Sequence, residues 1–255
     1  MSATAVSLPP ESRRVMLRRA QDRGHANFGW LDARFSFSFA SYQDPAHENF
    51  GPLRALNEDV ILPGTGFGPH GHSDMEIVLY PLSGVIEHRD SLGTHALVRP
   101  GDVQRMSAGH GIMHSQMNAS QSKLDHHLQI WLLPSVSGLP PSVEQAHFDD
   151  AAKHNRFCLI ASPDRQDGSV KLHQDARISA AIMEPGIRLS RELAAGRGGY
   201  LHVARGRLEA RPEGEQPVLL RAGDALKLVE TPSVELVAEE VTEVLFFDLP
   251  LSPQG

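Results

Sequence analysis

The chain has 255 residues, which suits one large domain or two domains of ordinary size. Acidic residues outnumber basic residues by 31 to 24, and the net charge of −7 argues against direct binding to nucleic acid or to an anionic membrane. No apolar run approaches the roughly 20 residues of a membrane span. The only cysteine is Cys158, so no disulfide can form within the chain, and a reducing, cytoplasmic location is predicted.

The first residues lack the charged and apolar segments of a signal peptide, so we expect residues 1–14 to form a flexible tail. Phe35, Phe37 and Phe39 then alternate with serines, which predicts a half-buried strand. Two further strands are expected at 84–89 and 94–98, with a turn at 90–93 between them. A polar stretch at 135–155 with two adjacent prolines predicts a linker.

Three segments of the first half recur in the second half in the same order. GVIEHR at 84–89 matches GRLEAR at 206–211, and LVRPGD at 97–102 matches LLRAGD at 219–224, both at an offset of 122 residues. LQIWLLP at 128–134 matches VLFFDLP at 244–250. Such repeats indicate duplicated units. We therefore predict two all-β domains, at 15–134 and 156–250, each a sandwich or barrel, with a short tail at 251–255.

Eight of the 14 histidines lie between His70 and His127. His70 and His72 are two residues apart in a segment typical of a strand, so their side chains are expected on one face, and Glu76 shares their parity. His114 and Gln116 form a second such pair. Imidazole nitrogens with one oxygen ligand suit Fe, Ni, Cu, Mn or Zn, so these pairs predict a mononuclear metal site.

The second half lacks these histidines. An offset of 122 places Glu192, Ala194, Leu236 and Ala238 at the corresponding positions, so we expect the second domain to fold without metal. Among the remaining histidines, His88 and His95 flank the predicted turn and are expected in solvent. Of the adjacent His126 and His127, at most one is expected to point inward.

The histidine segments resemble the two cupin motifs, as Gly64-x5-His70-x-His72-x3-Glu76 and Gly111-x2-His114-x3-Asn118. More closely, the chain resembles the pirin family over about residues 15–250. The resemblance is carried by RGHANFGWLDARFSFSFASY at 23–42, HGHSDMEIVLY at 70–80, GVIEHRDSLG at 84–93 and RPGDVQRMSAGHGIMHS at 99–115.

This resemblance implies a bicupin with one metal in the N-terminal domain, usually Fe(II), with Ni, Cu, Mn, Co or Zn as alternatives. The ligands of the family fall on His70, His72, His114 and Gln116. The last position is a departure, because the family pattern has glutamate there. An amide ligand brings no negative charge, so we predict weaker metal retention and a higher reduction potential than with glutamate.

Glu76 offers a second way to supply a carboxylate. In many cupins the glutamate at this motif position is a ligand, so Glu76 is predicted as an alternative ligand or as a catalytic base. A carboxylate that orients one of the ligand histidines is the other interpretation of Glu76.

Three functions are compatible with the sequence. Bacterial pirins resemble quercetin 2,3-dioxygenases, which implies oxidative cleavage of a small flavonol-like substrate by O2. Animal pirin implies instead a non-catalytic, iron-dependent redox sensor with a protein partner. A cupin isomerase or hydrolase is the third alternative.

Overall fold

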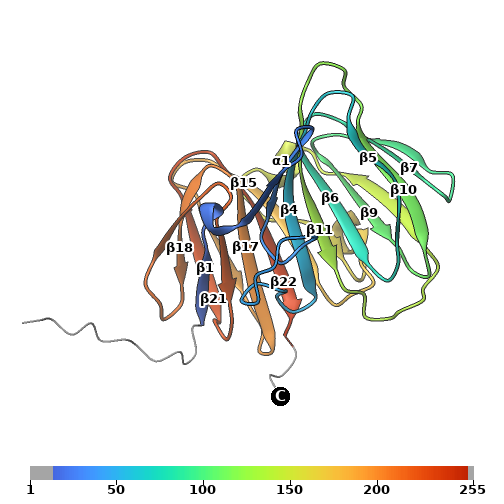
Figure 1. Cartoon of the computed structure of the whole chain (residues 1–255). Coiled ribbons are helices and arrows are strands. Elements are labelled where there is room, and N and C mark those ends of the chain that lie inside the picture. Colours follow the sequence, from blue (N-terminus) through green and yellow to red (C-terminus); the bar gives the residue numbers. More distant parts are fainter. Residues whose placement is uncertain (1–13, 252–255) are drawn as a thin grey trace, which may run out of the picture.

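The computed structural model describes residues 14–251, which form two β-rich domains side by side (Figure 1). Each domain is built from one seven-stranded and one four-stranded sheet. The expected all-β architecture with two tandem domains is confirmed. The predicted tail at 1–14 falls outside the described residues except for Arg14, whose carbonyl accepts a hydrogen bond from Val229 N at 2.7 Å.

The N-terminal domain places its small sheet over its large one. The small sheet has the order β5-β10-β7-β8, and the large sheet has the order β12-β9-β6-β11-β4-β3-β2. The strands are β2 (Gly24–Asn27), β3 (Leu31–Phe35), β4 (Leu53–Ile61), β5 (Gly66–His72), β6 (Glu76–Ser83), β7 (Ile86–Asp90), β8 (His95–Val98), β9 (Asp102–Ser107), β10 (Ile112–Asn118), β11 (Asp125–Leu132) and β12 (Ser142–His147).

The C-terminal domain repeats this plan. Its large sheet has the order β1-β20-β17-β22-β15-β13-β14, and its small sheet has the order β16-β21-β18-β19. The strands are β1 (Val15–Arg18), β13 (Cys158–Ser162), β14 (Val170–Lys171), β15 (Arg177–Met183), β16 (Arg188–Glu192), β17 (Arg197–Arg205), β18 (Arg207–Pro212), β19 (Val218–Arg221), β20 (Ala225–Leu228), β21 (Ser233–Ala238) and β22 (Thr242–Pro250).

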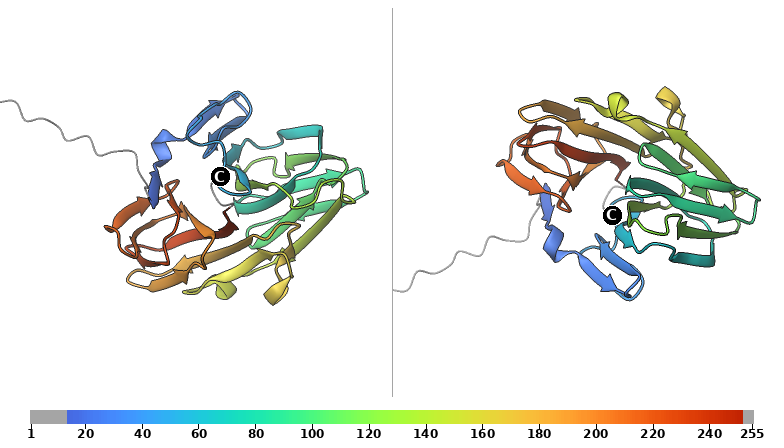
Figure 2. Two further views of the ribbon diagram at one scale, coloured as in Figure 1. Left: turned by 90° about the horizontal axis from the view of Figure 1, so that it is seen from below. Right: turned by 90° about the horizontal axis from the view of Figure 1, so that it is seen from above.

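Two edge strands shift the expected domain boundaries. β1 precedes the N-terminal domain in the chain but pairs antiparallel with β20 of the C-terminal domain (Figure 2). The predicted linker at 135–155 contains β12, which pairs with β9, and the one-turn helix α1 (Asp150–Lys153). Each strand satisfies backbone groups that an open sheet edge would expose, so both segments belong to sheets. The other short helices are η1 (Ala20–Asp22) and η2 (Gln166–Gly168).

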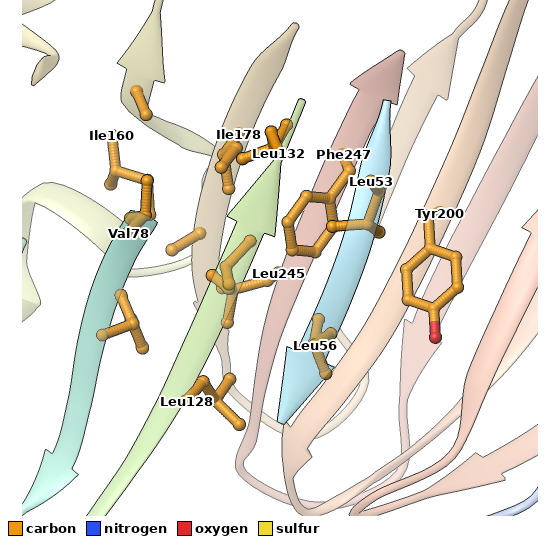
Figure 3. Close-up of a cluster of buried hydrophobic side chains, with 14 of the residues drawn as sticks. Leu53, Leu56, Val78, Leu128, Leu132, Ile160, Ile178, Tyr200, Leu245 and Phe247 are labelled. Carbon is orange, nitrogen blue, oxygen red and sulfur yellow. The ribbon is translucent and has the colours of Figure 1, made fainter. Parts of the chain in front are cut away.

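The largest apolar core lies between the two large sheets, where the domains meet (Figure 3). Alternate residues of β6 and β11, such as Val78 and Ile130, meet residues of the C-terminal sheet such as Ile178 and Phe247. The opposite faces of β6 and β11 point into the N-terminal domain. The large sheet of the N-terminal domain therefore packs against the other domain with one face and forms the back wall of its own barrel with the other.

Strand pairing in the small sheets shows which residues of the two domains correspond, and it corrects the offset of 122 expected from the sequence. Gln116 faces His88 across β10 and β7, whereas Leu236 faces Ala210 across β21 and β18. His88 and Ala210 occupy the same place in the repeated 84–89 and 206–211 segments. Leu236 therefore corresponds to Gln116, and Val234 corresponds to His114, so the offset on this strand is 120 and not 122. The two domains differ in the length of the preceding loops.

No helix within residues 14–251 is long and apolar enough to cross a membrane.

Candidate metal centre

His70, His72 and His114 lie together at the open end of the N-terminal barrel. His114 is paired with His70 across β10 and β5, and His72 follows two residues later on the same face. The ring centroids are 4.4 Å apart for His70 and His114, 4.8 Å for His70 and His72, and 5.0 Å for His72 and His114. One nitrogen from each ring lies within 4.8 Å of the others, so the three imidazoles can share one ion.

The approach of β5 to β10 depends on glycine. Gly66 has φ +154°, and a Cβ atom at this position would lie 2.4 Å from the backbone oxygen of Gln116. A Cβ at Gly71 would lie 3.0 Å from Met113 Sδ. A bulge between His114 and Gln116 then alters the register with β5. A larger residue at position 66 would therefore separate the strands and the histidines that they carry, whereas exposed Met113 could move away from a larger residue at position 71.

His72 and His114 are available as neutral ligands. Burial, together with the charge of His70, lowers the pKa of His72 to about 4. Burial and the neighbouring histidines lower the pKa of His114 to about 3. His114 is 3% exposed, and both of its ring nitrogens lack a hydrogen-bond partner among the described residues. A buried ring with two unpaired nitrogens is unfavourable unless a ligand pairs with it, and a metal ion meets this need.

Gln116 is held by a chain of hydrogen bonds inside the barrel. Trp131 Nε1 donates to Gln129 Oε1 at 3.0 Å, and Gln129 Nε2 donates to Gln116 Oε1 at 2.9 Å. The indole N–H can only donate, so it fixes the orientation of the Gln129 amide, and Gln129 in turn occupies the carbonyl oxygen of Gln116. The ring of Trp131 also contacts His72, with the centroids 4.9 Å apart.

His88 is buried and not solvated, which corrects the expectation from its place beside a turn. Its Nε2 atom lies 2.8 Å from Asp90 Oδ2, and its ring centroid is 5.4 Å from that of His114. The side chain of His88 alternates with exposed Arg89 and points into the barrel. His95 is exposed, and of the adjacent pair only His127 is fully buried, as expected.

Glu76 does not join the histidines. The expected single strand is interrupted at residues 73–75, so the parity shared with His70 and His72 does not carry across the break. Glu76 is buried, and its Oε2 atom accepts a hydrogen bond from His173 N at 3.1 Å and lies 3.4 Å from His173 Nδ1. It therefore connects the two domains. The roles predicted for Glu76 as an alternative ligand and as a base at the metal are not supported by this position.

A second group of buried polar side chains lies on β11 and β4 of the same barrel. His127 Nδ1 lies 2.6 Å from Asp125 Oδ2, and its Nε2 atom lies 3.7 Å from Asp59. Burial raises the pKa of Asp59 to about 6. The charge of His127 lowers this pKa, and the charge of Asp125 raises it. His127 is the inward-facing member of the pair expected from the sequence, whereas Asp59, Asp125 and the Gln129–Trp131 pair were not predicted. In 128–132, Gln129 and Trp131 alternate with Leu128, Ile130 and Leu132, and this alternation could have indicated that the pair shares one face of a strand.

A cavity of about 420 Å³ opens beside the histidines. Its walls come from the strand ends and loops around the site, and they are Gly71, His72, Ser73, Ser91, Gly111, Ile112 and Met113. Met113 is 48% exposed at its rim. The candidate metal centre therefore adjoins an open cavity at His72.

The comparisons with known proteins agree with this geometry. The Pirin family model matches residues 16–132, and the model described as quercetinase C-terminal cupin domain matches residues 159–249. A quercetin 2,3-dioxygenase of Escherichia coli is 40% identical over 236 residues, which is 92% of this chain and 99% of that protein.

Solved structures show the same relationship. Bacterial pirin YhhW of Escherichia coli in complex with nickel(II) is 40% identical, with a TM-score of 0.87, and the match covers 93% of this chain and all of that one. YhaK of Escherichia coli is 29% identical with a TM-score of 0.72, covering 89% and 98% of the two chains. This chain belongs to the pirin family.

Proposed function

We propose that this protein is a metal-dependent dioxygenase of the quercetinase type, which cleaves a flavonol or a similar enolic ring with O2. The observation that carries the proposal is the convergence of three imidazoles, one of which, His72, lines an open cavity. The related quercetin 2,3-dioxygenase of Escherichia coli supports the substrate class.

His70, His72 and His114 would hold one divalent ion, and Fe(II) is the metal that we propose. When bound, the ion lowers the pKa of a substrate hydroxyl and orients the resulting anion for oxidation. Imidazole nitrogens that bind a metal ion bring no negative charge, so the three ligands would leave the positive charge of the ion uncompensated. A deprotonated substrate oxygen is therefore favoured at this site over a neutral one.

A proton from the substrate hydroxyl needs an acceptor, and Gln116 cannot serve because an amide is not basic. We propose His88 for this role in place of Glu76. Although burial alone would raise the pKa of Asp90, hydrogen bonds from His88 and from backbone N–H groups lower it. Asp90 therefore stays ionised and is able to stabilise the charged imidazolium of His88.

The proposal is tested with iron-loaded protein prepared without oxygen and then mixed with quercetin and O2. Flavonol absorbance and release of CO are followed together. We expect turnover above that of free iron, and Gln116→Glu is measured alongside because it restores the family carboxylate. Absence of turnover in both proteins would exclude the enzyme function. Elemental analysis of protein purified without a histidine tag identifies the metal.

The proton acceptor is tested separately. His88→Phe removes the imidazole and leaves the three candidate ligands in place, so we expect metal content to persist while the rate of flavonol consumption falls. His95→Phe is the matched control, because His95 is an exposed histidine next to the same turn. Equal rates for His88→Phe and wild type would exclude His88 as the acceptor.

A further inference from the structure

A second cavity, of about 1280 Å³, lies away from the histidines, between the two domains. One side is formed by the N-terminal domain around residues 46–52, and the other by the loops at 193–197 and 229–232 of the C-terminal domain. Its apolar lining includes Phe50, Leu193 and Leu251. None of the residues of the candidate metal centre lines it.

Lys227 lies at this cavity with its ammonium group buried. Its side chain is on the opposite face of β20 from Leu226 and Leu228, which pack inside the C-terminal barrel. The residue is 5% exposed, and its Nζ atom donates a hydrogen bond to His47 Nδ1 at 3.2 Å. Nζ also lies 5.3 Å from the ring centroid of Phe37 and 5.8 Å from that of Phe50.

The surroundings of Lys227 provide little compensation for its charge. Within residues 14–251 it forms no salt bridge, although buried lysines are normally paired with a carboxylate. Burial, with the nearby charge of Arg18, lowers the pKa of Lys227 to about 8. Burial and the charge of Lys227 also lower the pKa of His47, so this imidazole is neutral and accepts the hydrogen bond.

Asp44, the carboxylate whose charge acts on Lys227, already has partners, and Glu230, which also lines the cavity, is exposed to solvent. Asp44 lies 3.2 Å from Arg18 and accepts a hydrogen bond from the Tyr42 hydroxyl at 3.0 Å. Arg197, the other cation at the cavity, is paired with Asp248 and lies 2.8 Å from Asp175. The ammonium of Lys227 is therefore the cation at this cavity that has donors to spare, since it has three and His47 accepts one.

We propose that the cleft between the domains is a binding site for a small organic carboxylate, whose charged end pairs with Lys227 and whose apolar body contacts the cavity lining. A carboxylate would supply the missing counter-charge in a partly desolvated place, where charge-assisted hydrogen bonds are strong. Phe50 lies near the ammonium and lines the cavity, so it would place apolar surface beside the anion. The site is distinct from that of the proposed oxidation.

Isothermal titration calorimetry with benzoate and with octanoate tests this proposal on the full chain. We expect binding of at least one probe, and Lys227→Met should weaken it at least about tenfold, since the charge-assisted hydrogen bond is lost. Benzamide, which has the same ring without the charge, should bind much more weakly than benzoate. Lys123→Met is the matched control because Lys123 is an exposed lysine elsewhere.

Two further variants locate the probe. Ala194→Trp places a bulky side chain at the exposed rim of the cavity and leaves Lys227 itself unchanged, so it should weaken binding while the protein stays folded. His114→Ala should leave binding unchanged. Failure of both probes to bind, equal affinity in Lys227→Met and wild type, or loss of binding in His114→Ala would each overturn the proposal.

Discussion

The interiors of the two barrels differ far more than their backbones do. The N-terminal barrel encloses buried polar side chains on strands β4, β7, β10 and β11, namely Asn57, Asp59, His88, His114, Gln116, Asp125, His127 and Gln129. The corresponding part of the C-terminal barrel is apolar, with Leu193, Leu208, Ala210, Val234, Leu236 and Ala238 in one cluster. The same sheet order supports both interiors, so the fold itself does not require the polar set.

The matched positions show what this difference means. Where the N-terminal barrel has His114 and Gln116, the C-terminal barrel has Val234 and Leu236, both fully buried. Apolar side chains stabilise the barrel by leaving water, whereas buried imidazoles stabilise it only when they are paired. One domain therefore carries groups that a ligand completes, and the other holds a core that is complete without one. The predictions below test this division, from the largest expected effect to the smallest.

Removing one imidazole should abolish metal binding without unfolding the domain. In His70→Ala we expect loss of stoichiometric metal, measured by elemental analysis. The melting temperature of the metal-free protein should stay within roughly 2 °C of wild type, because His70 is partly exposed and packs little apolar surface. A large fall in that temperature would show that the histidines hold the fold together.

The matched change in the other barrel should have the opposite result. Leu236→Ala leaves a cavity in a fully packed core, so we expect a loss of about 2–5 kcal/mol in the free energy of unfolding. Metal content should stay at the wild-type level. Denaturant unfolding and elemental analysis of the same preparation check both parts, and a loss of metal here would contradict the independence of the two interiors.

Restoring the carboxylate should strengthen the site. Gln116→Glu adds a negative charge at the candidate ligand position, and we expect the metal affinity to rise at least about tenfold. Two unit charges about 4 Å apart attract by about 4 kcal/mol even at an effective dielectric constant of 20. The reduction potential of bound iron should fall, because the added charge favours the ferric state. Competition with a chelator and redox titration measure the two effects. An unchanged potential would count against Gln116 being near the metal.

The smallest effect concerns the hydrogen bond that holds Gln116. Gln129→Met removes the donor to Gln116 Oε1 and frees this oxygen to turn toward a metal, so we expect affinity to rise a few-fold. In the Gln116→Glu background the same change should weaken affinity, because the carboxylate loses a hydrogen bond that orients it. Effects of the same sign in both backgrounds would show that Gln129 acts only by packing.

The sequence by itself determined the repeat, the all-β class and the three histidines. Residues two apart on one strand share a face, and the 84–89 and 206–211 segments have matching sequences, so these features are visible locally. From the sequence alone, the family resemblance also identifies Gln116 as a departure.

Only the tertiary structure decided which strands lie next to one another. The break at residues 73–75 turned Glu76 away from the histidines and toward His173, and strand alternation read through that break gave the wrong face. The sequence likewise does not reveal that β1 pairs with a strand of the other domain. Nor does it reveal that Gln129, itself bonded to Trp131, contacts Gln116 from another sheet. Contacts between distant segments depend on how sheets stack, and a local pattern carries no record of that stacking.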